Sequence, residues 1–455
     1  MHVGVRIGSW PAKDVLSPTQ PFQAVICLTA CLDKACGIDV HRDVLEAAIR
    51  DVDDNLWEAS FGTTSDELYR LKDWILETGC TTVAFESTGV YWRQLYNVLC
   101  KDCLVLVANP GKIKKPPLNK KKKTDKIDAK WIAKLCLAGM IEPSRVFLGK
   151  RYDLRELTRF RETLGKSVNQ FKNRAHRILE ACCVKIGSVL SDVFGVNGRR
   201  MLDDLVAAKD ADEILRGIKS KRIRQKEEAL RQALASGLDE TSRMLLKNCL
   251  EWIRSFEKEI KLIDQEIMRM IGDRKEELRI VMTIPGFGFV SGATVLAEIG
   301  NANDFPTGDH LASWSGLVSS VSQSAGKLVN GRITKHGSKH LRRMLVQIAH
   351  VISMMDNELS RFFHRIADVK GSKKAATALA RKLLTIIHHL LVNKEEYQSP
   401  TVKPKKIRLP RSPETSTPLS IEEMIALIRE TGRAVSDLPE PPVKRRRKSR
   451  LSGST

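Results

Sequence analysis

The chain has 455 residues, with 76 Lys and Arg against 54 Asp and Glu and a formal net charge of +22. This length suffices for two or three domains with substantial cores, and the charge predicts a polyanionic partner, most commonly nucleic acid. Its ten cysteines form no disulfide-like framework, and Cys100 and Cys103 lack a second pair for zinc. No apolar run approaches the roughly 20 residues of a membrane span. These features exclude a disulfide-rich secreted domain and a membrane protein, and they favour a reducing, cytoplasmic location.

Residues 1–34 are expected to form an N-terminal extension, because they are rich in Pro, Ser and Thr. The apolar stretch 22–32 has no basic segment before it, so it predicts a strand or an over-long start instead of an export signal.

Residues 35–150 alternate short apolar runs with helical patterns, which predicts an α/β domain. Three strands, a helix, then strand, helix, strand and helix is the order of a ribonuclease-H-like (RuvC-like) domain. The segments are ACGIDV, VLEAAIRD and LWEASF as strands, 64–79 as a helix, TTVAFES as a strand, 90–99 as a helix, LVLVANP as a strand, and 125–139 as a helix.

Four carboxylates fall at the ends of these elements. Asp39 and Glu86 end two apolar strands, and Asp125 and Asp128 are spaced i, i+3, which places both on one face of a helix. Bare charges are costly in an apolar interior, so carboxylates converging on one sheet edge suggest a compensating cation. Oxygen ligands favour Mg²⁺ or Mn²⁺, which serve phosphodiester chemistry.

Residues 151–278 are predicted to be helical. Apolar residues alternate steps of three and four along 157–178 and again along 246–270, which predicts two long helices in an antiparallel coiled-coil arm or one side of an intermolecular one. A charged region with several glycines, 195–240, separates them.

Residues 279–397 are expected to form a mostly helical C-terminal domain. The turn IPGFG (284–288) between two helical patterns is typical of a helix–hairpin–helix, in which backbone amides can approach a phosphate, although an ordinary Pro-Gly turn has the same pattern. Residues 398–455 end in KRRRKSR and predict a disordered basic tail, with a short helix around IEEMIALIRE.

A second group of polar residues occupies 311–345. Small residues and hydroxyls crowd the segment 319–327, which is expected to be a loop, and cations follow it. A serine there can act as a nucleophile towards phosphorus, with the cations holding phosphates, but no neighbouring general base is evident. A serine-rich surface loop beside a basic helix is the simpler interpretation of the residues alone.

Several motifs together resemble one family. GIDVHRD, FESTGVYW, KTDKIDAKWIA, IPGFG, GLVSSVSQSAGK and GRITKHGSKHLRRMLVQIA occur in collinear order between about residues 35 and 393. They resemble the DEDD-type insertion-sequence transposases of the insertion-sequence-110 family, which are related to the pilin-gene invertases. The resemblance implies an N-terminal RuvC-like domain, a coiled-coil region and a C-terminal transposase domain.

The resemblance also implies site residues. The metal-binding acidic residues fall on Asp39, Glu86, Asp125 and Asp128, and the serine that forms a covalent link to DNA falls on Ser324. The usual motif is close to Ser-Ser-Gly-Gly-Lys, so Gln323 and Ala325 depart from it and Ser322 is the fallback nucleophile. Phosphate contacts are expected from Lys327, Arg332, Lys335, Lys120, Lys121, Lys122 and Lys123.

The resulting hypothesis is an enzyme of a mobile element: a transposase or site-specific recombinase that cuts and rejoins DNA with Mg²⁺ or Mn²⁺ and a serine–DNA intermediate. The alternatives are a RuvC-like endonuclease with a water nucleophile and a non-catalytic nucleic-acid-binding protein. Some family members use a structured guide RNA, and the seven lysines in 112–123 fit such a partner without proving it. Two DNA ends must meet, so a homodimer or homotetramer is expected.

Overall fold

The computed structural model describes residues 32–398, except 88, 112, 114–123, 219 and 325–326, and gives only the backbone at 221–222 and 321–330. Residues 1–31 of the N-terminal extension, the four lysines Lys120 to Lys123 and the basic tail from residue 399, with its expected short helix, lie outside the described residues. The described chain divides into two compact units, which are treated separately: 32–159, 294–350 and 362–395 form the first, and 160–293, 351–361 and 396–398 the second.

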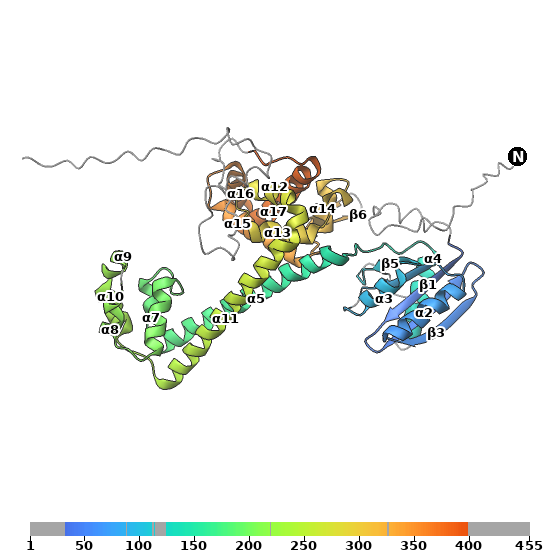
Figure 1. Cartoon of the computed structure of the whole chain (residues 1–455). Coiled ribbons are helices and arrows are strands. Elements are labelled where there is room, and N and C mark those ends of the chain that lie inside the picture. The colour runs from blue at the N-terminus through green and yellow to red at the C-terminus, as the bar shows by residue number, and fades with distance from the viewer. Residues whose placement is uncertain are drawn as a thin grey trace, which may run out of the picture. The chain divides into compact units, whose positions relative to one another are not determined.

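The N-terminal part of the first unit is a five-stranded mixed sheet with three helices (Figure 1). The strand order is β3-β2-β1-β4-β5, with β1, β2 and β3 antiparallel and β1, β4 and β5 parallel. The predicted order of strands and helices is therefore confirmed. The elements are β1 (Lys34–Val40), β2 (Val44–Asp51), β3 (Leu56–Gly62), α2 (Ser65–Glu77), β4 (Thr82–Glu86), α3 (Trp92–Leu99), β5 (Leu104–Ala108) and α4 (Asp125–Leu137).

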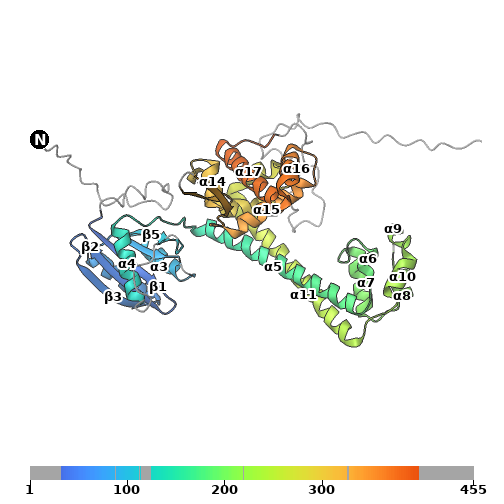
Figure 2. The same ribbon diagram turned by 180° about the vertical axis from the view of Figure 1, so that it is seen from behind.

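The two faces of this sheet are covered by different helices. Alternate residues point to opposite faces of a strand, so Ile38 and Phe85 enter the core with α2 and α3, whereas Ala35 and Ala84 pack with α4. Figure 1 views the sheet from the side of α2, and Figure 2 views it from the side of α4. The face under α4 carries small side chains, which lets that helix lie close to the sheet.

The closest approach is at Gly37 of β1. A Cβ atom at this position would lie 2.2 Å from the backbone nitrogen of Ala133 and 2.3 Å from the backbone oxygen of Ala129, both in α4. Only glycine fits between the strand and this helix. Gly37 therefore determines how near the first turn of α4 comes to the end of β1.

The second unit is built on two long antiparallel helices, α5 (Gly149–Ala181) and α11 (Glu240–Met270), which lie side by side in both views (Figures 1 and 2). Arg161 pairs with Asp264, whereas Phe171, further along α5, contacts the earlier Trp252. This arrangement agrees with the predicted antiparallel pair, while its description as a coiled coil stays a prediction.

The charged region 195–240 and the short segment before it fold into short helices that share a core with α5 and α11. Leu202, Leu215 and Leu230 are buried there. The apolar residues between the charges are thus enough to build a compact helical body. The helices are α6 (Ile186–Val189), α7 (Val196–Val206), α8 (Ala211–Arg216), α9 (Lys221–Arg224) and α10 (Glu227–Leu234).

The C-terminal part of the chain is mostly helical, as predicted. The turn IPGFG joins α12 to α13, but its contact with phosphate stays a prediction. Residues 319–324 of this segment form strand β6, which pairs with β7, so their interpretation as a loop is wrong. The elements are the 3₁₀ helix η2 (Ile271–Arg274), α12 (Lys275–Thr283), α13 (Phe289–Ile299), η3 (Ala302–Asp304), α14 (Gly308–Trp314), β6 (Ser319–Ser324), β7 (Lys327–Ile333), α15 (Lys339–Ser353), α16 (Glu358–Lys370) and α17 (Ser372–Asn393).

Helix α17 is the one described helix that is long and apolar enough to cross a membrane by length and composition. Its Leu379, Leu383 and Ile387 are fully buried within the protein. His388 also hydrogen-bonds to the backbone oxygen of Phe305 at 2.8 Å. The apolar character of α17 is thus accounted for by the protein core.

Gly37→Ala is expected to destabilise the α/β domain by about 1–3 kcal/mol or more, because the added methyl group would overlap the backbone of α4. Chemical denaturation measures the change. Gly165→Ala is the matched control, since nothing lies within 4 Å of a Cβ atom at this helical position; it should stabilise the protein by about 0.5–1 kcal/mol. Equal stability of wild type and Gly37→Ala would contradict the close approach.

Candidate active site

Two carboxylates stand at the carboxyl ends of neighbouring parallel strands. The register of β1 and β4 pairs Ile38 with Phe85, so Asp39 and Glu86 follow by one residue in each strand. Since the preceding pair enters the core with α2 and α3, the two acidic side chains belong to the opposite face, under α4. Strand alternation therefore carries both carboxylates to the same edge of the sheet.

Helix α4 adds two more carboxylates from its first turn, where Asp125 and Asp128 lie. The partial positive charge at a helix N-terminus stabilises acidic groups there. Gly37 lies two residues before Asp39 on the same face of β1, so the close approach of α4 at that glycine brings its acidic turn towards Asp39.

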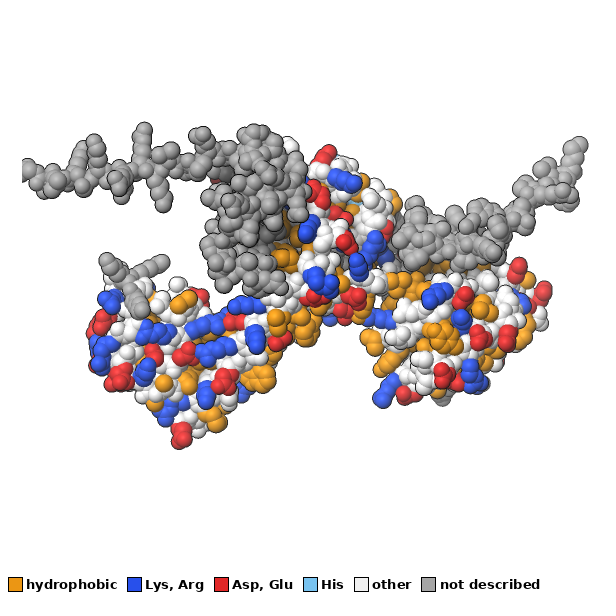
Figure 3. Space-filling model, viewed as in Figure 1, with side chains coloured by type: hydrophobic (Ala, Val, Ile, Leu, Met, Phe, Trp, Pro, Cys, Tyr) orange, Lys and Arg blue, Asp and Glu red, His pale blue; other side chains and the backbone are white. Residues whose placement is uncertain are grey.

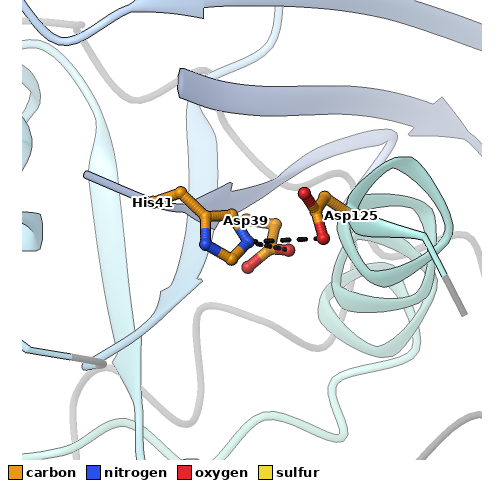
Figure 4. A group of neighbouring side chains, drawn as sticks. All are labelled: Asp39, His41 and Asp125. Carbon is orange, nitrogen blue, oxygen red and sulfur yellow. Dashed lines mark hydrogen bonds and ion pairs between the residues drawn. The ribbon is translucent and has the colours of Figure 1, made fainter. Parts of the chain in front are cut away.

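Asp39, His41 and Asp125 come together at the start of α4 (Figure 4). Each offers one ligand atom, and these atoms lie within 4.8 Å of one another. His41 Nε2 lies 3.1 Å from Asp39 Oδ2 and 3.4 Å from Asp125 Oδ1. This is the one such group of potential metal ligands within the described part of the chain.

The pKa of Asp39 shows that the ionised form of this side chain is disfavoured in this arrangement. Burial raises its pKa, the charges of Asp128 and Asp125 raise it further, and His41 partly opposes them, with a net upward shift. The native state thus holds a proton more tightly than the unfolded chain does. As a result, the fold without metal loses stability as the pH rises from the ordinary aspartate pKa through the raised value.

The residues present fit a divalent cation. Carboxylate oxygens are hard ligands of the kind that Mg²⁺ and Mn²⁺ prefer, and positive charge at this point opposes both the burial and the neighbouring negative charges that raise the pKa of Asp39. The group of potential ligands contains Asp39 and Asp125 of the four predicted carboxylates. Asp128 lies near enough for its charge to raise the pKa of Asp39, and Glu86 ends the adjoining strand, but neither belongs to that group.

The second predicted group lies on the hairpin of β6 and β7. Ser324 is the last residue of β6 and pairs with Lys327, the first residue of β7. Only the backbone is described here, so the structure places Ser324, Ser322 and Lys327 on the hairpin without orienting their side chains. Arg332 and Lys335, near the other end of β7, are exposed.

The base of this hairpin is held tightly. Gly316 precedes the hairpin, Gly337 follows it, and both adopt positive φ. A Cβ atom on either would lie about 2 Å from a backbone oxygen of the segment on the opposite side of the hairpin base. Arg342 donates to the backbone oxygens of Ser315 and His336, each at 2.9 Å, and of Gly337 at 3.0 Å. Arg342 thus organises the base of the hairpin through backbone contacts.

Sequence reasoning missed His41. An isolated histidine in a strand-end turn carries little information by itself. Its spacing of two residues from Asp39 was the available signal, since residues i and i+2 of an extended chain lie on the same side.

Comparison with known proteins matches two parts of the chain to family models. Residues 36–184 match the DEDD transposase model of the IS110 group, and residues 278–364 match the model described as "Transposase IS116/IS110/IS902 family". The first match contains all four predicted carboxylates, and the second contains the hairpin.

Curated relatives point to the same group. The chain is 29% identical over 139 residues to the transposase for insertion sequence element IS1111A of Coxiella burnetii, covering 30% of this chain and 38% of the relative. It is 26% identical over 159 residues to a probable family 20 transposase of Pseudomonas aeruginosa, covering 34% and 46%. It is also 30% identical over 145 residues to the pilin gene-inverting protein of Moraxella bovis, covering 30% and 45%.

Each of these alignments spans less than half the length of the relative. The two family matches, however, fall in the order and at the places that the sequence motifs require, one on the α/β domain and one on the C-terminal helical part. The chain belongs to the IS110 family of DEDD-type transposases.

Proposed function

We propose that this protein is a transposase or site-specific recombinase that cuts and rejoins DNA through a covalent serine–DNA intermediate. The observation that carries the proposal is the convergence of Asp39 and Asp125 at one end of the sheet, where the charge of Asp128 also acts. Family membership supports DNA as the substrate, because the relatives are named as transposases and a gene-inverting protein.

The α/β domain is proposed to be RuvC-like. Its central β1 pairs with the antiparallel β2 on one side and with the parallel β4 on the other, an order compatible with that fold. We also propose that the long helices α5 and α11 form a coiled-coil arm. The Pro-Gly turn between α12 and α13 supports the proposal that these two helices form a helix–hairpin–helix.

Asp39, Glu86, Asp125 and Asp128 would hold Mg²⁺ or Mn²⁺. A bound divalent cation supplies positive charge that polarises the scissile phosphate and stabilises the leaving oxygen. The protein's own part is to hold four carboxylates at one site, against their repulsion, by means of strand ends and a helix N-terminus. His41 bridges two of these carboxylates and orients them.

Ser324 is the proposed nucleophile. Its Oγ forms a bond to phosphorus while the bond from phosphorus to the bridging deoxyribose oxygen breaks. That oxygen leaves with the electron pair, and the serine proton passes to solvent. One phosphoester replaces another, so rejoining is the reverse reaction with a different deoxyribose hydroxyl. Ser324 ends β6 and pairs with Lys327, which would place a cation on the neighbouring strand beside the nucleophile.

Positive charge is proposed to hold the nucleic acid. Arg332 and Lys335 are exposed beside the hairpin, and Lys327 begins β7. Lys and Arg side chains are also spread over the surface of the second unit (Figure 3). We also propose that the protein acts in the cytoplasm, with the DNA, as a homodimer or homotetramer. A guide RNA is proposed as a further partner, and its phosphates would contact Lys120, Lys121, Lys122 and Lys123.

Asp125→Ala and Asp128→Ala are each expected to abolish strand cleavage and to weaken Mn²⁺ binding by about tenfold or more. Thermal stability without metal should be kept or should rise, because each change removes a repulsive charge. Calorimetric titration and end-labelled DNA measure these effects. Asp43→Ala is the control, since this carboxylate is exposed and pairs with Arg42 at 3.4 Å. Wild-type cleavage by either α4 variant would remove α4 from the site.

Ser324→Ala should bind DNA and metal as wild type does but form no covalent adduct, because the attacking oxygen is gone. Ser322→Ala is the matched control on the same strand and should still form the adduct. Denaturing gels with end-labelled DNA and peptide mapping identify the linked residue. An adduct on Ser322 would move the nucleophile by two residues, and cleavage without any adduct would assign attack to water in a RuvC-like nuclease.

Nucleic-acid affinity is expected to fall steeply with salt, because Lys and Arg displace condensed counterions with a slope of about −0.9 per phosphate contacted. Deleting 403–455 should flatten this slope and leave cleavage intact, since both family matches end before residue 403. Binding titrations at several salt concentrations measure the slope. A shallow slope for the full chain would contradict a phosphate-binding role for its net charge.

A further inference from the structure

Glu298 of α13 is a fully buried carboxylate held by two arginines of α5. Arg155 Nε donates to Oε2 at 2.8 Å, and Arg159 donates to Oε1 from Nε at 2.7 Å and to Oε2 from Nη2 at 3.1 Å. The side chain of Glu298 is 0% exposed. Burial acts to raise its pKa, but the hydrogen bond from Arg159 and the charges of both arginines outweigh this, and the pKa lies below its usual value. Glu298 is therefore ionised at neutral pH.

The same carboxylate is hydrogen-bonded to Ser338, at the base of the β6–β7 hairpin. Ser338 is buried, and its Oγ also accepts a hydrogen bond from the backbone nitrogen of Leu341 at 3.1 Å, which caps α15. Ser338 directly follows Gly337, whose backbone is packed against Trp314 and bonded to Arg342. The segment that follows β7 is thus held in place by hydrogen bonds where it contacts Glu298.

The other side of the contact is the chain that leaves the α/β domain. Arg145, in the connection between α4 and α5, donates to the backbone oxygens of Ile299 and, at 3.1 Å, of Asn301. It also forms an ion pair with Asp304. Arg145, Arg155 and Arg159 therefore fasten this connection and the start of α5 to the end of α13, and all these residues belong to the first unit.

We propose that Glu298 is a positioning residue, which fixes the base of the serine-bearing hairpin against the start of α5. This inference rests on the proposed function, in which Ser324 must be presented to the DNA held at the carboxylates. A buried ion pair offers little net stability, because desolvation offsets the attraction between the charges. What it does supply is geometry: two guanidinium groups and one hydroxyl meet on two carboxylate oxygens in a defined orientation.

Glu298→Gln keeps the size of the side chain and removes its charge. The rate of adduct formation at saturating DNA is expected to fall by about tenfold or more, since small displacements of reacting groups are costly. Half-saturating DNA concentration and Mn²⁺ affinity should stay within about twofold of wild type, because neither ligand touches Glu298 in the proposed function. An unchanged rate in the folded variant would overturn the inference.

Two further variants separate positioning from stability. Asp264→Asn breaks another arginine–carboxylate pair of α5, in which Arg161 of α5 donates to Asp264 of α11 at 2.5 and 3.1 Å, and should leave the rate unchanged. Glu298→Gln leaves the half-buried Arg155 and Arg159 without their carboxylate, which should lower thermal stability. The triple variant Arg155→Gln, Arg159→Gln and Glu298→Gln removes all three charges and should restore thermal stability without restoring the rate. Restoration of both would show that only stability was affected.

A measurement independent of catalysis keeps the inference distinct from the proposed function. Spin labels introduced as unnatural amino acids at the exposed positions Asp153 and Arg332 report the spread of distances between α5 and the hairpin. The distribution should broaden in Glu298→Gln and stay narrow in Asp264→Asn. If the wild type forms no adduct but the distance distribution still broadens in Glu298→Gln, the serine mechanism fails and the positioning role stands. Equal distance distributions in wild type and Glu298→Gln would overturn the positioning role.

Discussion

The burial of one carboxylate beside others is the constraint on which the candidate active site depends. Burial raises the pKa of Asp39, and the charges of Asp128 and Asp125 raise it further, so the fold must hold these groups together against an electrostatic cost. It does so through the close packing of α4 on β1 at Gly37. The packing energy of the apolar face beneath α4 is thus what holds the acidic turn of this helix beside the strand end.

The arrangement of the α/β domain was predictable from local patterns. Alternating apolar runs identify the strands, and the spacing of Asp125 and Asp128 places both on one helical face. The serine-rich segment was harder to interpret. Its small residues suggested a loop, yet hydroxyls at 320, 322 and 324 alternate with other side chains, which is a strand pattern, and the segment pairs with β7.

The contact at Glu298 could not be predicted from the sequence. The residue lies in the apolar run of α13, where a single acidic residue looks like an exposed position of an amphipathic helix. Its partners Arg155 and Arg159 lie 143 and 139 residues away in the chain. Only the tertiary packing of α5 against α13 brings the three charges together, and no local period records that packing.

The carboxylates of Asp39 and Glu298 have pKa shifts of opposite direction. At Asp39 burial and, to a smaller extent, the neighbouring carboxylates raise the pKa, and positive charge from outside the chain is favoured. At Glu298 the chain supplies its own cations, the pKa is lowered, and the compensation is permanent. The first arrangement suits a site that gains a cation, because positive charge offsets the cost of holding ionised carboxylates there. The second suits a fixed joint, since nothing has to bind for its geometry to be complete.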